Sequence, residues 1–239
     1  ENQVKELIKA AKFTIFFIDE NQKVTLKDIG SIDLIEKYAK EFDAEIIKGE
    51  LVSQFRCDGS DAYIAWLDDV LQIRETANTD YYGIDYDFRV YDNPHDLLHE
   101  IEKQNQINNK SRILAGYCWE WPTAERTNAK HKDIVIPEFN FEISWNLSDS
   151  IWAIDQNSVN QAGCIHTAQG LEFDYVGVII GPDMRFENGE VITDYTKRAK
   201  TDQSLKGIKT MAKEDSEKAK AVADAIIRNT YRTLMARGQ

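Results

Sequence analysis

The sequence predicts an α/β fold built around a parallel sheet, and two observations lead to that prediction. Short apolar runs rich in β-branched residues alternate along the chain with amphipathic stretches of helical spacing. The two clearest runs, 14–18 and 176–180, both end at polar clusters, as buried strands do where loops begin. With 239 residues, of which 42% are apolar, the chain has material for one large domain or two unequal ones.

The first part of the chain predicts one strand and one helix. Residues 14–18 are β-branched and aromatic, so we expect a buried strand there. Ser31 is a typical N-cap residue, and the apolar residues behind it recur at helical spacing, which predicts a helix directly after it. The short runs 46–47 and 50–52, on either side of Gly49, have the composition of strands.

Two further helices are expected in the middle of the chain. Ser60 or Asp61 caps the first of them. Asn93 precedes the second, and Pro94 suits its first helical position because proline has no backbone N–H to donate. The residues expected to face inward from these two helices are Ile64, Leu67, Val70 and Leu71, and then Leu97, Leu98 and Ile101.

The second half of the chain predicts two strands, an irregular region and one long helix. Residues 112–117 and 176–180 are the strand candidates. Residues 123–161 are rich in Asn, Asp and Trp, which predicts long loops or an insertion. Residues 212–236 read as one continuous helix. Its expected inward-facing residues are Ala221, Ala225, Ile226, Tyr231 and Leu234.

Composition excludes several classes of protein. The formal net charge is −12, which argues against a generic nucleic-acid binder because phosphate contacts require Lys and Arg. The longest apolar runs have about five residues, whereas a membrane helix needs about 20, so we expect no membrane partner. The three cysteines lack CxxC spacing, which predicts neither a disulfide scaffold nor a metal site and favours a cytoplasmic location.

The charge is distributed unevenly along the chain. Residues 197–239 contain 11 basic and 5 acidic side chains, although the whole chain is acidic. Two interpretations are open: a local electrostatic footprint for an anionic partner, or a solvated basic helix.

Polar clusters beside the predicted strands are the candidate functional sites. In open parallel sheets, ligands bind where loops converge at the carboxyl ends of strands. One cluster is 19–22, and the other is 164–174, which leads into the strand at 176–180. Arg56 and Arg237 are isolated arginines, and a guanidinium can grip a phosphate through two hydrogen bonds.

These clusters resemble the superfamily-one helicases, and more specifically the Schlafen group 3-like DNA/RNA helicase domain family of largely uncharacterised bacterial proteins. Residues 17–22 resemble motif III, 54–56 resemble motif IV, 164–174 resemble motif V, and 229–238 resemble motif VI. The motifs occur in the family's order and span nearly the whole chain. One departure is at Ala236, where the family has a threonine before the motif VI arginine.

The resemblance implies a RecA-like fold of the P-loop NTPase type. Residues 1–50 would be the C-terminal end of a first RecA-like domain, and 51–239 would be the second motor domain. No G-x-x-x-x-G-K-[ST] phosphate loop occurs in the sequence, and the chain begins at Glu1 rather than Met. We therefore expect a piece of a longer protein whose upstream RecA-like domain is its partner.

The resemblance also implies the roles of individual residues. Gln22 would sense the ATP γ-phosphate, and Arg56 and Arg237 would supply positive charge during catalysis. The implied nucleotide-binding residues are Asp19, Gly170 and Glu172, and the implied contacts to single-stranded DNA or RNA are His166 and Thr167. ATP and Mg²⁺ would bind the intact protein, and neither is expected to bind this chain tightly on its own.

Other interpretations stay open at this stage. Each site residue, taken alone, also has a structural interpretation. Gln22 could be a turn residue and Arg56 could form an ion pair. His166 could be a hydrogen-bonded interior histidine, and Glu172 could cap a helix. The chain could be a RecA-like module that binds nucleic acid or protein without turnover. It could also be a nuclease built on Asp43, Glu45 and Lys48, although the Glu–Lys spacing is one residue too long for both to face one way on a strand. Base stacking and packing are alternative roles for Trp119, Trp121, Trp145 and Trp152.

Overall fold

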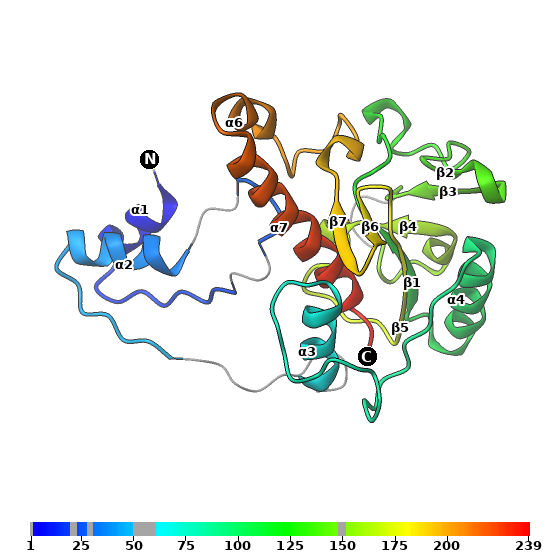
Figure 1. Cartoon of the computed structure of the whole chain (residues 1–239), viewed down its shortest axis with the longest axis horizontal. Helices are drawn as coiled ribbons and strands as arrows, with labels where there is room; N and C mark the ends of the chain where they lie inside the picture. Colours follow the sequence, from blue (N-terminus) through cyan, green and yellow to red (C-terminus); the bar gives the residue numbers. More distant parts are fainter. Residues whose placement is uncertain (1, 20–22, 28–30, 50–60, 148–151) are drawn as a thin grey trace.

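The computed structural model of the chain has a five-stranded sheet at its centre, in the order β2-β3-β4-β1-β5 (Figure 1). The residues that the structure describes are 2–19, 23–27, 31–49, 61–147 and 152–239. The strands of the sheet are β1 (Ser111–Ala115), β2 (Ile134–Ile136), β3 (Phe141–Trp145), β4 (Gln161–Gly163) and β5 (Tyr175–Ile179). β3, β4, β1 and β5 run parallel to one another, while β2 pairs with β3 in the antiparallel sense. The predicted α/β class and the strands at 112–117 and 176–180 are therefore confirmed.

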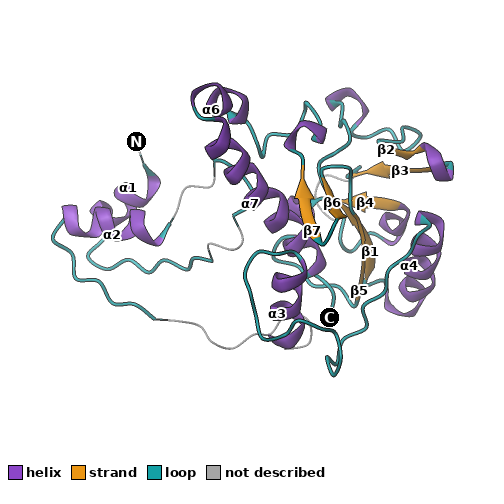
Figure 2. Ribbon diagram, in the orientation of Figure 1, coloured by secondary structure: helices purple, strands orange, loops and turns teal. Residues whose placement is uncertain are grey.

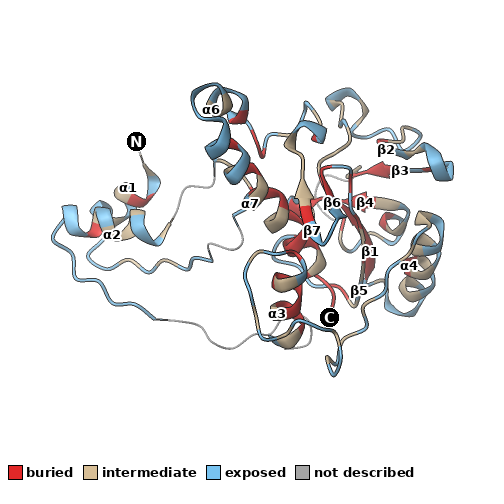
Figure 3. Ribbon diagram, in the orientation of Figure 1, coloured by how far each residue is buried: buried red, intermediate tan, exposed pale blue. Residues whose placement is uncertain are grey.

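Helices cover both faces of this sheet (Figure 2). α4 (Pro94–Asn108) packs on one face, where Ile101 meets Ile113 of β1. α3 (Asp61–Val70) and α7 (Ser216–Met235) pack on the other, where Leu114 meets Ile227. Every residue of β1 is buried, because alternate side chains enter the two cores (Figure 3). The β5 edge of the sheet carries no further strand among the residues that the structure describes.

The other elements lie around this core. They are α1 (Gln3–Ala10), α2 (Ile32–Glu41), α5 (Ile165–Ala168), α6 (Ile208–Glu214), and the antiparallel hairpin of β6 (Met184–Glu187) and β7 (Glu190–Thr193). Short 3₁₀ helices cover Thr123–Glu125, Pro137–Phe139, Gln156–Asn160 and Tyr195–Lys197. None of the described helices is long and apolar enough to cross a lipid bilayer.

Two of the three predicted N-caps are present. Of the two candidates for the third, Ser60 lies outside the described residues and Asp61 is the first residue of α3. The Ser31 hydroxyl accepts a hydrogen bond from the backbone N–H of Leu34 at 3.1 Å, which starts α2. The Asn93 side-chain oxygen accepts from the N–H of His95 at 2.9 Å, with Pro94 at the first position of α4. In α3, Val70 is 41% exposed and does not face inward as predicted, since the inward face of that helix is set by larger aromatic side chains.

The strand predicted at 14–18 is not formed in the structure. Ile15 and Phe17 are 63% and 82% exposed, and no described strand pairs with this segment. A run of strand-forming residues becomes a strand only when a neighbour supplies hydrogen bonds and cover. The run 46–47 is also irregular, with Ile47 82% exposed, and the run 50–52 lies outside the described residues.

The region 123–161 was predicted to be irregular, but it extends the sheet. Ile134, Phe141 and Ile143 are buried in the same core as α4. β2 and β3 are joined by a short turn in which Asn140 has a φ of 49°, a left-handed conformation that Asn tolerates well. Three- and five-residue strands are too short to give a clear periodic signal, which explains the error.

The C-terminal helix predicted at 212–236 is two helices. Asp215 has an extended backbone (φ −150°) between α6 and α7, and its side chain accepts from the N–H of Lys218 at 2.9 Å. Ala221 and Ala225 are exposed rather than inward-facing, whereas Tyr231 and Leu234 are buried as predicted. Ile226 is also buried as predicted. The remaining buried residues of α7 are Ala219, Ala223, Ile227, Thr230, Arg232 and Thr233.

Replacing the N-cap residue of α7 should measurably destabilise the folded protein. We expect Asp215→Ala to lower the free energy of unfolding by about 1 kcal/mol, because the N–H of Lys218 loses its acceptor. Urea unfolding monitored by circular dichroism measures the change. Asp215→Asn keeps a capping oxygen and should stay close to wild type. Equal losses in the two variants would show that the cap is not the cause.

The basic character of residues 197–239 is divided between the interior and the surface. The arginines of this region are engaged within the protein: Arg198, Arg232 and Arg237 are buried, and Arg228 contacts Asp224 at 2.8 Å. Arg232 pairs with the buried Asp68 of α3. The seven lysines of the region are exposed. The surface is therefore less basic than the residue count predicts.

Candidate functional site

The polar segment 164–174 begins where β4 ends, at the carboxyl edge of the sheet. Its first turn is α5, and Thr167 holds that turn in place. The Thr167 hydroxyl accepts from the backbone N–H of Cys164 at 2.9 Å and donates to the carbonyl of Cys164 at 3.0 Å. His166 is exposed on the same turn. The turn therefore presents His166 to solvent, while the Thr167 hydroxyl is used to keep its shape.

The second half of this segment returns to the amino end of β5. Gly170 has a φ of +83°, and a Cβ placed there would meet no atom within 4 Å. The Gly170 backbone is therefore open to close approach by a ligand. Glu172 is exposed, and its Oε2 accepts from Nε2 of Gln239 at 2.8 Å. Phe173 is 3% exposed and anchors the segment in the core.

The end of α7 is joined to the same segment. The backbone N–H of Phe173 donates to the carbonyl of Arg237 at 2.8 Å. The Arg237 side chain is 2% exposed, and its Nε donates to the carbonyl of Thr233 at 3.1 Å. Its Nη1 lies 3.5 Å from the carbonyl of Leu171. The structure thus brings Arg237 beside the second half of the 164–174 segment, with its guanidinium covered by protein.

Three further site residues were predicted in the first 56 residues of the chain. Gln22 and Arg56 lie outside the described residues. Asp19 is described and exposed, in the N-terminal part of the chain. Further along that part, the backbone N–H of Leu26 donates to the carbonyl of Ser204 at 2.7 Å, which attaches it to the loop before α6.

The residues proposed for a nuclease do not form a carboxylate–lysine cluster. Asp43 has a φ of 52° and follows the end of α2, so it is not on a strand. Glu45 is exposed, and Lys48 pairs with Glu36 of α2 instead. Within the described residues, no three His, Cys, Asp or Glu side chains are close enough together to hold a metal ion.

A buried ionic network at the carboxyl edge of the sheet was not singled out from the sequence. Asp183 is fully buried just after β5, and it accepts from Nε of Arg198 at 2.7 Å and from the Tyr231 hydroxyl. Arg198 also lies 3.3 Å from Asp202 and donates to the Thr230 hydroxyl at 3.2 Å. Because Thr230 and Tyr231 belong to α7, the network ties that helix to the loop after β5.

The sequence signals for this network are incomplete. Asp183 is visible as part of the polar run after a predicted strand. Nothing in the sequence marks Arg198, 15 residues further along, as its partner. Tyr231 was predicted to face inward, but its hydrogen bond to Asp183 depends on tertiary packing.

Burial also controls the protonation of this region. It raises the pKa of the Tyr231 hydroxyl well above its usual value, and the nearby Asp183 carboxylate adds to the effect. Burial acts to lower the pKa of Arg198, but the charges of Asp183 and Asp202 outweigh it, so the pKa is raised. The pKa of Cys118 is raised by burial and by Asp183. That thiol therefore stays protonated at neutral pH and is a poor nucleophile.

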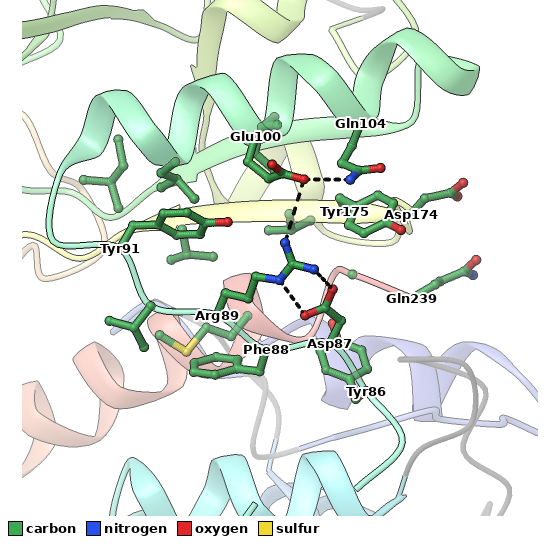
Figure 4. A pocket seen from close by; sticks show the side chains of 18 of the residues that line it. Tyr86, Asp87, Phe88, Arg89, Tyr91, Glu100, Gln104, Asp174, Tyr175 and Gln239 are labelled. Carbon is green, nitrogen blue, oxygen red and sulfur yellow. Dashed lines mark hydrogen bonds and ion pairs between the residues drawn. The ribbon is translucent and has the colours of Figure 1, made fainter.

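A pocket of about 360 Å³ lies along the outer edge of β5 (Figure 4). α4 forms one wall, residues 86–91 form the other, and Asp174 lies at one end. Arg89 is the only basic residue among the described residues that line it. Its guanidinium pairs with Asp87 at 2.7 Å and approaches Glu100 at 3.9 Å. Because acids outnumber this arginine, the pocket does not suit a phosphate group.

Comparison with known proteins gives a family match over the whole chain. A sequence model described as "Schlafen group 3, DNA/RNA helicase domain" matches residues 1–239. An uncharacterised protein of Saccharomyces cerevisiae, YPL245W, is 21% identical over 262 residues. That alignment covers 100% of this chain and 55% of the yeast protein, so the chain spans about half the length of this relative. No solved structure shows a significant match.

Proposed function

Because the chain belongs to the Schlafen group 3 DNA/RNA helicase domain family, we propose that it is part of an ATP-dependent helicase or translocase. One observation carries the proposal: the 164–174 segment is hydrogen-bonded through Phe173 to the end of α7. His166 lies at one end of this segment, and Arg237 lies beside the other. A conformational change at the proposed nucleotide site, near Arg237, can then be transmitted to the proposed nucleic-acid contact, His166, through the backbone of residues 164–174.

The proposed nucleotide lies beside Gly170 and Glu172. The open backbone at Gly170 allows close approach, and the exposed Glu172 carboxylate can accept a hydrogen bond from a ribose hydroxyl. These residues fit one side of a nucleotide. The phosphate loop and the Mg²⁺ ligands would come from an upstream RecA-like domain, because this sequence contains no phosphate loop. ATP supplies the energy of phosphoryl transfer when it is bound there.

The proposed catalytic charge comes from arginine. Arg237 and Arg56 would stabilise the negative charge that develops on the γ-phosphate. Gln22 would sense whether the γ-phosphate is present, and Asp19 would help to bind the nucleotide. Arg237 is 2% exposed, so this role requires its guanidinium to exchange the carbonyl of Leu171 for a phosphate oxygen. Closure of two domains around a nucleotide is the kind of step that produces such an exchange.

The exposed apolar residues near the N-terminus support the proposed partner domain. Phe13, Ile15 and Phe17 are 76%, 63% and 82% exposed. Large apolar side chains that are exposed close together in the sequence are candidates for contact with another domain. We therefore place residues 1–50 at the end of the first RecA-like domain and residues 51–239 in the second. Single-stranded DNA or RNA is the proposed macromolecular ligand.

ATP hydrolysis by the full-length protein tests this proposal. Turnover should be measured without nucleic acid and then with single-stranded DNA or RNA, using this chain alone as the control. Stimulated turnover in the full-length protein and none in the chain alone supports a shared motor. The nucleic acid that stimulates turnover more strongly, DNA or RNA, is then identified as the ligand. Absence of turnover in the full-length protein would contradict the proposal.

A second candidate function is a RecA-like module that binds nucleic acid or protein without turnover. The burial of Arg237 favours it, because a guanidinium that donates to the carbonyl of Thr233 already has a structural role. Binding of single-stranded nucleic acid by a full-length protein that hydrolyses no ATP would select this candidate.

His166 offers a specific test of the nucleic-acid side. We expect His166→Ala to reduce the stimulation of ATPase activity by single-stranded nucleic acid several-fold, because this side chain is exposed and is the proposed nucleic-acid contact. Basal turnover should be retained, because His166 is not among the proposed nucleotide-binding residues. Thr167→Ser is the matched control on the same turn, since serine keeps the hydroxyl that bonds to Cys164. Unchanged stimulation in His166→Ala would remove this residue from the nucleic-acid interface.

A further inference from the structure

We propose that Arg126 and Trp121 form a base-stacking subsite for single-stranded nucleic acid. The proposal rests on the function proposed above and adds residues that lie outside the helicase motifs. The Arg126 guanidinium carbon lies 4.2 Å from the centroid of the Trp121 ring. This distance is that of a stacked guanidinium, and Arg126 is exposed to solvent. Within the described part of the chain, Arg126 forms no ion pair that would occupy its charge.

The Arg126–Trp121 pair is connected to His166 by a series of aromatic rings. The Trp121 and Trp145 centroids are 6.2 Å apart, those of Trp145 and Tyr117 are 5.7 Å apart, and those of Tyr117 and His166 are 6.2 Å apart. Trp145 is 3% exposed and fixes the series to the core, which confirms a packing role for that tryptophan. In this proposal the exposed residues Arg126 and His166 mark the two ends of one binding surface, and the ring contacts link them through the buried Trp145.

Lysines border this surface. Residues 199–201 run beside the segment after β1, since the N–H of Ala199 donates to the carbonyl of Tyr117 at 2.9 Å. This arrangement places the backbone of Lys200 beside the segment that contains Tyr117 and Trp121, with Lys197 three residues before it in the sequence, and both lysines are exposed. Glu120, an acid on the same segment, accepts from the N–H of Lys200 at 2.7 Å, so backbone amides already solvate its charge.

The chemistry of the surface matches single-stranded nucleic acid. A guanidinium plane held by an indole can stack on a base, and free lysines can contact the phosphates on either side. A duplex keeps its bases stacked inside and cannot offer them to Arg126. The whole chain has a net charge of −12, which argues against non-specific attraction of nucleic acid by the protein as a whole.

Binding by the full-length protein tests the subsite. Fluorescence anisotropy should be measured with labelled oligothymidylate, oligouridylate and an abasic deoxyribose-phosphate polymer of the same length. We expect Arg126→Lys to weaken binding to at least one of the two base-containing polymers by about fivefold or more, because lysine keeps the charge but cannot stack as a plane. Binding to the abasic polymer should stay at the wild-type level. Lys9→Ala, an exposed basic residue on α1, is the control and should match wild type on all three.

The outcomes separate the subsite from the broader function. If the wild-type protein binds and His166→Ala weakens binding while Arg126→Lys does not, the subsite is overturned and the proposed function stands. An equal loss for Arg126→Lys on all three polymers would also overturn stacking, since only a phosphate contact would then be involved. If the wild-type protein binds neither base-containing polymer, both proposals are overturned. If Arg126→Lys weakens binding to oligothymidylate more than binding to oligouridylate, the ligand is DNA. The reverse order indicates RNA.

Discussion

Arg237→Ala should reduce nucleic-acid-stimulated ATP hydrolysis by the full-length protein about 10³-fold or more. The proposed role of Arg237 is to neutralise charge that develops as the γ-phosphate is transferred, and arginines in that position have effects of this size. The measurement is kcat for ATP hydrolysis at saturating single-stranded nucleic acid. Arg237→Lys should recover little of the loss, because an ammonium group cannot make the paired hydrogen bonds of a guanidinium.

Stability must be separated from catalysis in this experiment, since Arg237 is 2% exposed. Removing its guanidinium leaves the carbonyl of Thr233 without this donor, at a cost of about 1–3 kcal/mol if the carbonyl stays buried. Leu234→Ala is the matched control: Leu234 is fully buried on the same helix, and its truncation should cost about 2–5 kcal/mol. Leu234→Ala should keep its turnover below its melting temperature. Near-normal turnover in Arg237→Ala would instead assign this arginine to structure alone.

The sequence predicted the parts of the fold that depend on local chemistry. Ser31 and Asn93 start helices because a short polar side chain can satisfy an N–H that the helix leaves free. β1 and β5 were visible because each contains a short run rich in apolar residues, at 113–115 and 176–179. In each of these cases the signal lies within a few neighbouring residues, so a short stretch of sequence is sufficient to predict the element.

Most of the errors occur where distant residues decide the outcome. Residues 14–18 have the composition of a strand, yet no described strand pairs with them. β2 and β3 have weak local signals but complete the sheet through pairs such as Ile134 with Ile143. One error was local: Asp215 was placed inside a continuous helix, although Asp is a typical N-cap residue and here it caps α7 by accepting from the N–H of Lys218.

The candidate site shows the same division. The resemblance of residues 164–174 and 229–238 to two helicase motifs predicts that both serve one nucleotide site, and that site stays a prediction. The structure does bring the two segments into contact through Phe173 and Arg237. The burial of Arg237 and the pairing of Asp183 with Arg198 were not predictable. The sequence identifies a charged residue, but the tertiary fold determines which residue it pairs with and how exposed it is.

Asp183→Ala should lower the free energy of unfolding by about 3–5 kcal/mol, one of the largest single-residue effects in this protein. The substitution leaves the buried Arg198 without the carboxylate that lies 2.7 Å from its Nε. It also removes the acceptor of the buried Tyr231 hydroxyl. Chemical denaturation of the chain measures the loss. Asp183→Asn keeps an oxygen for the Tyr231 hydroxyl and should cost less than Asp183→Ala.

A double-mutant cycle shows whether the cost comes from the unpaired charge. Arg198→Met removes the guanidinium while retaining much of its volume, so Asp183→Ala combined with Arg198→Met should cost clearly less than the two single losses added together. Glu187→Ala breaks the exposed ion pair with Arg185 and should change stability little, which controls for the loss of any ion pair. Additive losses, within about 0.5 kcal/mol, would mean that Asp183 and Arg198 are not coupled. In that case hydrogen bonding to Tyr231 and apolar packing, rather than charge, would hold α7 to the loop after β5.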